Sequence, residues 1–267
     1  MSEPPLKITV ATVTYNAAAQ IGRTIASVEA QDYPHVEHLI IDGNSQDDTL
    51  AAVHHYQERN SVAPVQHEIN CLSEPDDGLY DAMNKALDMA TGDYIVFLNA
   101  GDTLHSPTTL SHVAAVARQA KTGRRGKLPA VIYGDTDLVD SEGRFLRHRR
   151  LSPPEKLTWR SFRSGMLVCH QAFYARTDLA RQFPYDQRYR FSADFDWCIR
   201  IMREAKRGKL ALVHSHEVLA DYLSEGMTTQ NHQASLRERF HIMTRHYGWI
   251  STSIYHLWFV LRSLLKK

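Results

Sequence analysis

The sequence predicts an α/β protein with a mostly parallel central sheet and helices on both faces of that sheet. Three observations support this fold class. Short apolar runs alternate with segments of helical periodicity through the first half of the chain. The run Tyr94–Leu98 is apolar throughout, which is typical of a strand buried on both faces. Polar residues follow several of the apolar runs, where ligands bind in sheets of this kind.

Each predicted strand is a short apolar run, and each predicted helix places apolar residues three or four positions apart. The predicted strands are Ile8–Val13, Val36–Ile41, Tyr94–Leu98, Val131–Tyr133, Leu210–Val213 and Val218–Tyr222. The predicted helices are Ile21–Val28, Thr49–Gln57, Tyr80–Ala90, Asp194–Arg203, Gln233–His246 and Trp249–Lys266.

The composition argues against several classes of protein. The formal net charge is +1, so no strong field points to a nucleic-acid partner. Cys71, Cys169 and Cys198 lie far apart without a CxxC pair, which indicates reduced thiols rather than a disulfide framework or a zinc site. Met1–Lys7 lacks the apolar core of a signal peptide, and no stretch offers the roughly 20 mostly apolar residues of a spanning helix. We therefore expect a cytoplasmic protein.

Polar residues directly follow four of the predicted strands. Since the carboxyl ends of parallel strands meet at one edge of a sheet, we expect these residues to share one ligand-binding crevice. The four segments are Thr14-Tyr15-Asn16, Asp42-Gly43-Asn44-Ser45-Gln46-Asp47-Asp48-Thr49, Asn99-Ala100-Gly101-Asp102 and Gly134-Asp135.

Two acids at these strand ends are candidates for donor recognition. Asp42 is placed to accept a hydrogen bond from a nucleobase N–H, although a plain strand–turn–helix connection also explains the segment. Asp102 is placed to bind Mg²⁺ or Mn²⁺ together with diphosphate oxygens, because hard cations take oxygen ligands. A helix cap or a turn is the alternative for a lone Asp in such a loop.

The segment Ser73–Lys85 carries four acids just before and inside a helix start. Acids favour a helix N-terminus, so capping is one explanation. Capping does not call for Asp81, Asn84 and Lys85 together on neighbouring turns. We therefore expect this loop and helix, including Asp77 and Gly78, to enclose a bound donor.

A second acidic helix start, Ser192–Trp197, carries Asp194 and Asp196 two positions apart. One of them is expected to be the general base that takes a proton from an acceptor, although acids also suit a helix N-terminus. His170 and Gln171 are candidates for lining the acceptor site. Two further histidine groups lack ligand-like neighbours in the sequence and are interpreted as structural: His54-His55 and His214-Ser215-His216.

Taken together and in order, these motifs resemble the family 2 glycosyltransferases of the GT-A fold, and within them the bacterial exopolysaccharide branch, including the colanic-acid type. The resemblance covers roughly Ile8 to Thr229. It rests on Thr14-Tyr15-Asn16, Asp42 to Thr49, Ser73 to Lys85, Asn99 to Asp102, Cys169-His170-Gln171, Ala193-Asp194 and Glu225-Gly226-Met227-Thr228-Thr229.

The resemblance implies a nucleotide-sugar donor and specific roles for individual residues. Thr14 and Asp42 would hold the nucleoside, Asp102 would bind Mg²⁺ or Mn²⁺, and Asp194 would be the base, with Asp196 as its rival. The donor-binding residues implied in full are Thr14, Tyr15, Asn16, Asp42, Asp77, Gly78, Asp81, Asn84, Lys85, Asn99, Ala100 and Gly101.

The sequence departs from the family pattern at three positions. The family often has Asp where this chain has Asn99 and Gly101, which leaves fewer acids for a metal ion, and the first acid of its Glu-Asp pair is Ala193 here. Family members invert the anomeric centre, which suits a single base and direct attack. UDP is the expected nucleotide on family frequency alone.

Two other functions fit an α/β protein that uses a metal. A sugar-phosphate nucleotidyltransferase would have a Gly-rich, basic phosphate loop after the first strand, where this chain has Thr14–Ala19. A non-catalytic nucleotide-sugar-binding protein would not need both Asp102 and Asp194. An inverting glycosyltransferase that acts on a glycan or a polyprenyl-linked acceptor, in bacterial surface or exopolysaccharide synthesis, is therefore preferred.

We expect one domain over residues 1–248, with a donor half up to about residue 105 and an acceptor half from about 106 to 248. Residues 249–267 form a predicted C-terminal amphipathic helix. Its apolar stripe comprises Ile254, Leu257, Trp258, Leu261, Leu264 and Leu265. The stripe either packs on the core or makes a peripheral contact with the inner face of the plasma membrane.

Overall fold

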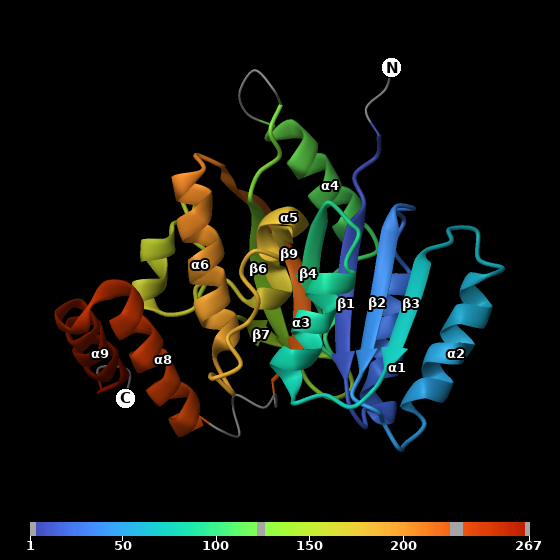
Figure 1. Cartoon of the computed structure of the whole chain (residues 1–267), viewed down its shortest axis with the longest axis horizontal. Helices are drawn as coiled ribbons and strands as arrows, with labels where there is room; N and C mark the ends of the chain where they lie inside the picture. Colours follow the sequence, from blue (N-terminus) through green and yellow to red (C-terminus); the bar gives the residue numbers. More distant parts are fainter. Residues whose placement is uncertain (1–3, 122–125, 225–231, 265–267) are drawn as a thin grey trace.

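A computed structural model of the chain describes residues 4–121, 126–224 and 232–264. The motif Glu225–Thr229 lies outside these residues. The described residues contain a nine-stranded sheet that takes strands from both halves of the chain, in the order β3-β2-β1-β4-β8-β6-β9-β5, with β7 paired to β6 (Figure 1). The strands are β1 (Ile8–Thr14), β2 (Val36–Asp42), β3 (Glu68–Ser73), β4 (Tyr94–Phe97), β5 (Thr103–Leu104), β6 (Val131–Val139), β7 (Phe145–His148), β8 (Phe173–Arg176) and β9 (Leu212–Leu223).

Most of the sheet is parallel. Strands β3, β2, β1 and β4 pair in parallel, and so do β6 and β9. The exceptions are β8, which runs antiparallel between β4 and β6, and the short strands β5 and β7. The predicted α/β class with a mostly parallel sheet is confirmed.

Helices cover both faces of this sheet because its central strands bury alternate side chains on opposite sides. In β1, Ile8 and Val10 join the core beneath α1 and α4, whereas Ala11 and Val13 join the core beneath α3 and α6. The helices are α1 (Ala18–Glu29), α2 (Thr49–Asn60), α3 (Leu79–Met89), α4 (Thr109–Gln119), α5 (Thr177–Ala180), α6 (Ala193–Arg207), α8 (His232–Tyr247) and α9 (Trp249–Leu264), with 3₁₀ turns η1 (Trp159–Ser164) and η2 (His170–Ala172).

Strands β6 and β9 differ from the sequence prediction. Strand β6 continues past Gly134 and Asp135 to Val139, so the expected strand end at Gly134-Asp135 is wrong. The two strands expected within 210–222 are one strand, β9, whose pairing with β6 shifts register around Asp135. A Cβ on Gly134 would lie 2.5 Å from the Glu217 carbonyl oxygen, so glycine permits this close approach. The polar segment 214–217 is thus an irregularity within a strand.

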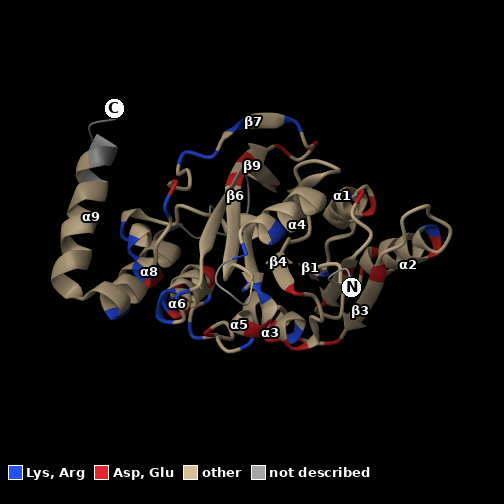
Figure 2. Ribbon diagram, turned by 90° about the horizontal axis from the view of Figure 1, so that it is seen from above, with Lys and Arg blue, Asp and Glu red and all other residues tan. Residues whose placement is uncertain are grey.

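The C-terminal helices α8 and α9 lie at one end of the sheet, beside α6 (Figure 1). None of the helices in the described part of the chain is long and apolar enough to cross a membrane. In the view of Figure 2, α9 stands apart from the sheet. Residues 249–261 of this helix include no lysine or arginine.

Candidate active site

A chain of polar side chains joins the end of β4 to the start of α6. Asn99 Nδ2 lies 3.3 Å from His170 Nε2, and His170 Nδ1 lies 3.1 Å from Asp194 Oδ2. The structure therefore brings together three candidates that are far apart in the sequence. Asn99 follows β4, His170 begins η2, and Asp194 is in the first turn of α6.

The carboxylate of Asp194 is held by donors on both of its oxygens. Oδ1 accepts hydrogen bonds from Tyr80 Oη at 3.2 Å and from the backbone N–H of Phe195 at 2.8 Å, while Oδ2 faces His170. Burial alone would raise the pKa of Asp194, but the His170 hydrogen bond and charge, helped by Arg239, lower it below the ordinary value. Asp194 is therefore ionised at neutral pH and able to accept a proton.

Asp102 is held by the residue next to His170. Gln171 Nε2 donates to Asp102 Oδ2 at 2.9 Å, and the backbone N–H of Leu223 donates to Oδ1 at 3.2 Å. Burial raises the pKa of Asp102, and these two donors with His170 and Arg23 offset only part of that effect. A carboxylate in this state would gain from a nearby cation.

The loop after β4 fits a hard divalent cation. The buried Oδ1 of Asn99 has no hydrogen-bond partner among the described residues, and it belongs to the same four-residue loop as Asp102. Buried polar atoms are normally satisfied, so this oxygen is available to a ligand. One or two protein oxygens are what Mg²⁺ usually takes alongside substrate phosphates.

The nucleoside candidates lie at the ends of β1 and β2. Asp42 is fully buried, and it accepts hydrogen bonds from the backbone N–H and hydroxyl of Ser45 and from the hydroxyl of Ser73. Asp42 therefore shapes the turn that it begins, and because its side chain is fully buried, a nucleobase would need a local rearrangement to contact it. Its predicted base contact stays a prediction. Thr14 Oγ1 is buried without a partner among the described residues, and thus remains available to a ligand.

Tyr15 and Asn16 have different environments. The Tyr15 side chain is 63% exposed, so its ring is accessible at the mouth of this edge. Asn16 adopts φ of 47° and accepts a hydrogen bond on Oδ1 from the backbone N–H of Gln46. Its own backbone N–H donates to Ser45 Oγ at 2.8 Å. Asn16 thus ties the ends of β1 and β2 together through its backbone and side chain.

The acidic loop before α3 lies against the β2 turn. A Cβ on Gly43 would lie 2.6 Å from Asp76 Oδ2 and 3.3 Å from Tyr15 Cδ2, so these three residues are in close contact. Gly78 has φ of 111°, which favours glycine, and the backbone N–H of Asp77 donates to Asp81 Oδ2.

Three predicted donor-binding residues on α3 have structural partners. Asn84 exchanges two hydrogen bonds with the backbone of Tyr185, at 3.0 and 2.7 Å, so its amide positions the segment before α6. Lys85 Nζ bonds the Pro75 carbonyl and pairs with Glu74 at 2.8 Å. Asp81 Oδ1 accepts from Gln187. Both polar groups of the Asn84 amide are thus already used within the chain, and its predicted contact with the donor stays a prediction.

Asp196, the second acid at the start of α6, takes part in two buried ion pairs. Its side chain is fully buried and pairs with Arg200 Nε at 2.6 Å and with His246 Nε2 at 2.6 Å. Two positions along a helix turn a side chain to a different face, so Asp196 points toward α8 while Asp194 points toward the crevice. Asp196 is therefore already paired on both of its oxygens, and the choice of Asp194 as the base stays a prediction.

The chain matches the family described as glycosyl transferase family 2 over residues 9–182, which is more than half of its length. The chain belongs to glycosyl transferase family 2. The matched stretch contains Thr14, Asp42, Asn99, Asp102, His170 and Gln171.

Curated relatives of this family 2 chain extend the likeness past the matched stretch. The chain is 30% identical over 227 residues to the PGL/p-HBAD biosynthesis glycosyltransferase of Mycobacterium bovis, which covers 83% of this chain and 78% of the relative. It is 28% identical over 189 residues to the amylovoran biosynthesis glycosyltransferase AmsB of Erwinia amylovora, which covers 70% of this chain and 60% of AmsB.

Solved structures confirm the GT-A fold. S. aureus TarS 1-349 in complex with UDP superposes with a TM-score of 0.65 at 17% identity, covering 90% of this chain and 66% of that one. The mannosyltransferase PcManGT of Pyrobaculum calidifontis, in complex with GDP-Man and Mn²⁺, gives a TM-score of 0.61 at 20% identity over 91% of this chain and 65% of that one. The chain spans 40% of the longer TarS chain.

This family 2 chain has glycine at position 101, where the family often has Asp, and the local backbone and packing favour the glycine. Gly101 has φ of 100°, and a Cβ there would lie 2.6 Å from Leu223 Cδ1. An Asp at this position would therefore strain the backbone and require the Leu223 side chain to shift. Glycine at position 101 thus suits the backbone conformation of this loop, and Asp102 and Asn99 are the side chains of the loop that carry oxygen atoms.

Sequence reasoning missed a polar row across four neighbouring strands. His148 Nδ1 lies 2.7 Å from Asp137 Oδ1, and His105 Nδ1 lies 2.8 Å from Asp221 Oδ1. His105, Asp137 and Asp221 have ligand atoms within 4.8 Å of one another. Asp221 lies two positions from Leu223 on β9, so the row adjoins Asp102. Only the pairing of β5, β6, β7 and β9 unites these residues, and no short motif signals it.

Proposed function

We propose that this family 2 glycosyltransferase is an inverting enzyme that moves a sugar from a UDP-sugar to a hydroxyl of a glycan or polyprenyl-linked acceptor in bacterial surface polysaccharide synthesis. The observation that carries the proposal is the pairing of His170 with Asp194 beside the Gln171–Asp102 pair. Two adjacent residues of one 3₁₀ turn thereby each hold a buried carboxylate, His170 that of Asp194 and Gln171 that of Asp102.

In the proposed reaction, Asp194 takes the proton of the acceptor hydroxyl while the oxygen of that hydroxyl attacks the anomeric carbon of the donor sugar. The new bond joins the acceptor oxygen to that carbon, and the bond from the carbon to the diphosphate oxygen breaks with its electron pair on the diphosphate. A single base with direct attack inverts the configuration. Tyr80, His170 and the Phe195 N–H orient the carboxylate, which restricts its attack geometry.

Asp102 and Asn99 would hold a Mg²⁺ or Mn²⁺ ion, which supplies electrostatic stabilisation of the negative charge on the diphosphate. The raised pKa of buried Asp102 and the unpartnered Oδ1 of Asn99 support this assignment. Gln171 fixes the orientation of Asp102 and leaves the remaining lone pairs of its carboxylate for a ligand.

For the donor, the buried unpartnered hydroxyl of Thr14 and the exposed ring of Tyr15 support a nucleoside site at the ends of β1 and β2. An aromatic ring exposed at such an edge offers a face on which a base stacks. The complexes of TarS with UDP and with UDP-GlcNAc support UDP, and that of PcManGT supports GDP as the competitor to test.

For the acceptor, AmsB supports an exopolysaccharide role, because its name places it in amylovoran biosynthesis. A polyprenyl-linked acceptor would lie at the inner face of the membrane. The exposed apolar face of α9 supports peripheral binding at that surface, where Trp249, Ile250 and Trp258 would enter the lipid boundary.

The decisive experiment incubates the purified chain with radiolabelled UDP- or GDP-sugars, Mn²⁺ and a lipid-linked acceptor, with Asp194→Asn as the matched control. We expect wild-type protein to release nucleoside diphosphate and to label the acceptor, and the variant to do neither at a comparable rate. Pyrophosphate release from UTP and a sugar phosphate would instead indicate a nucleotidyltransferase. Donor binding without turnover under any acceptor condition would indicate a non-catalytic binding protein.

A further inference from the structure

Strand β9 carries two histidines, and the imidazole of His214 is the more buried of the two. Its side chain is 11% exposed, and neither ring nitrogen has a hydrogen-bond partner among the described residues. Tyr133 stacks on the ring with a centroid separation of 5.0 Å and an interplanar angle of 7°, and His216 packs against it at 4.5 Å. Burial of two polar nitrogens without partners is unfavourable, so the arrangement calls for a ligand.

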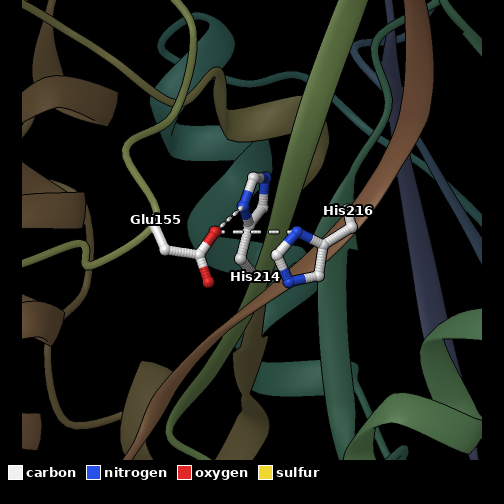
Figure 3. A group of neighbouring side chains, drawn as sticks. All are labelled: Glu155, His214 and His216. Carbon is white, nitrogen blue, oxygen red and sulfur yellow. Dashed lines mark ion pairs between the residues drawn. The ribbon is translucent and has the colours of Figure 1, made fainter.

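A carboxylate faces both histidines. Glu155 Oε2 lies 3.7 Å from Nδ1 of His214 and 3.7 Å from Nδ1 of His216, and Figure 3 shows both rings turned toward this oxygen. These separations exceed hydrogen-bond length. They are close to the edge of about 3.4 Å expected between two ligands of a tetrahedral zinc ion with bonds of about 2.0–2.1 Å. The three ligand atoms lie within 4.8 Å of one another.

The segment that carries Glu155 is fixed by the residue stacked on His214. Tyr133 Oη donates toward the carbonyl oxygens of Pro154 and Glu155 at 3.1 Å, and it accepts from the Leu157 N–H at 3.1 Å. Tyr133 therefore holds the Glu155 backbone in place and supports the His214 ring. Such preorganisation reduces the loss of conformational freedom when a ligand binds.

The backbone of His216 is also constrained. His216 has φ of 62°, in the left-handed region that few residues other than glycine adopt. Strained conformations of this kind persist only where the surrounding structure enforces them, and they concentrate at functional sites. His214 and His216 are two positions apart on β9, and their rings lie on the same side, both facing Glu155 (Figure 3).

An outer carboxylate completes the arrangement. Asp135 Oδ2 lies 3.8 Å from His214 Nε2, on the ring nitrogen opposite to the one that faces Glu155. Metal-bound histidines usually donate their second N–H to a carboxylate or carbonyl, which fixes the tautomer and orients the ring. Asp135 is the side chain placed to do this once the ring is held.

We propose that Glu155, His214 and His216 bind a transition-metal ion of the zinc class, with Asp135 as the outer partner of His214. Two imidazoles and one carboxylate suit Zn²⁺ better than Mg²⁺, which takes oxygen ligands. The site is thus chemically different from the oxygen site at Asp102, and its argument does not depend on the transferase function. The bound ion ties the segment before η1 to β9. The side chains of Glu155 and His216 are 72% and 63% exposed, so solvent reaches the open coordination position.

The site is tested by titrating the metal-stripped full chain with Zn²⁺ in a calorimeter, and with Co²⁺ while following its visible absorption. We expect one tight equivalent in the wild type, tetrahedral Co²⁺ bands and a higher melting temperature with Zn²⁺. His216→Ala and Glu155→Gln change exposed side chains, so both should fold and lose that equivalent. Asp135→Asn should weaken affinity about 10–100-fold. His55→Ala, at an exposed histidine next to His54, is the matched control and should bind like the wild type.

Equal stoichiometry and affinity in the wild type, His216→Ala and Glu155→Gln would overturn the proposal. Loss of the same equivalent in His55→Ala would also overturn it, because binding would then belong to surface histidines in general. Circular dichroism and thermal melts of the metal-free variants check that each one is folded, so that a lost equivalent reports the site itself.

Discussion

His170 Nδ1 lies 3.1 Å from Asp194 Oδ2, and this contact sets the electrostatic state of the candidate base. Burial would raise the pKa of Asp194, but His170 reverses the direction of the shift. The next residue, Gln171, holds Asp102, whose pKa burial raises. Burial thus shifts the pKa of Asp102 upward, whereas the contact with His170 shifts that of Asp194 downward, which suits Asp194 to accept a proton and Asp102 to bind a cation.

The two acids of α6 should respond differently to the same substitution. We expect Asp194→Asn to lower kcat by about 10²-fold or more, the range for a lost general base, and to leave donor affinity unchanged. Asp196→Asn removes the anion from a buried pair with Arg200 and His246, so it should destabilise the fold by about 3–5 kcal/mol. Turnover assays with chemical denaturation of both variants check this. A larger effect of Asp196→Asn on kcat, at unchanged stability, would reverse the assignment.

His170→Ala should move the acidic limb of the pH–rate profile toward higher pH. His170 lowers the pKa of Asp194, so its removal raises that pKa, and the base then loses its charge at a higher pH. His170→Asn keeps a donor near the Nδ1 position and should recover part of the shift. The measurement is kcat/KM against pH for the three proteins. If the acidic limb stays in place in His170→Ala, the residue only shapes the site.

The predicted strands were correct where burial on both faces leaves an apolar run, as in β1, β2 and β4. Strand β3 escaped prediction because Glu68–Ser73 is exposed or half-buried along its length and contains no continuous apolar run. The sequence predicts a break between two strands at the polar segment 214–217, yet the pairing with β6 continues around it. Sequence patterns report burial, and pairing at a sheet irregularity depends on partners far along the chain.

In the candidate site, too, local sequence predicts individual residues, whereas the contacts between them depend on the fold. The sequence placed Asp102 and Asp194 in ligand-facing segments, but their connection through Gln171 and His170 depends on the fold, because Asn99 and His170 are 71 positions apart. The sequence predicts Asp42 as a nucleobase acceptor, whereas its hydrogen bond from Ser73 depends on the pairing of β3 with β2. Glu155 was not associated with His214 and His216, because nothing local in the sequence links a proline-rich loop to an irregular strand.

Asp102→Asn should abolish the metal dependence of donor binding. The substitution keeps the size of the side chain and its contact with the backbone N–H of Leu223, but removes the charge that a divalent cation needs. Calorimetric titration with UDP, with and without Mn²⁺, should show a metal-dependent gain in affinity in the wild type only. Gln171→Ala is the companion variant, and it should weaken this gain without removing it. An unchanged gain in Asp102→Asn would place the cation elsewhere.

His38 should make the fold sensitive to mild acid. Its ring is fully buried between Thr12 Oγ1 and Tyr56 Oη, and burial, with the charge of His67, lowers its pKa from 6.5 to about 3. The unfolded chain takes up a proton near pH 6.5 that the folded chain refuses until about pH 3. Stability is therefore full above pH 6.5 and falls as pH drops, by about 1.4 kcal/mol per pH unit within this window.

The matched variants are His38→Gln, which removes the titration, and His54→Gln at an exposed position. The free energy of unfolding is measured by urea denaturation at pH 6.5 and at about pH 5. Between these two pH values, the wild type and His54→Gln should lose on the order of 2 kcal/mol more of it than His38→Gln does. The His38→Gln protein is expected to be less stable at pH 7, because it loses buried hydrogen bonds. Parallel pH curves for all three proteins would show that His38 does not carry the acid sensitivity.

The outer face of α9 should bind anionic lipid. Four members of the predicted apolar stripe are exposed, with 62%, 62%, 52% and 44% of their surface accessible in Ile254, Leu257, Trp258 and Leu261. The opposite side of the helix carries the packing, because Thr252 is buried and Tyr255 and Phe259 contact the main core. The alternative that the stripe packs on the core does not hold for these four residues.

This division of faces makes lipid binding separable from folding. Ile254→Ser with Leu257→Ser and Trp258→Ser should abolish sedimentation with vesicles that contain phosphatidylglycerol, because apolar area is what inserts at the lipid boundary. The melting temperature should change little, since exposed side chains contribute little to the core. Tyr255→Ser is the control. It should lower the melting temperature, but the protein that remains folded should still bind the vesicles. Equal sedimentation of the triple variant and the wild type would contradict a membrane role, and loss of its cooperative melt would show that the stripe supports the fold.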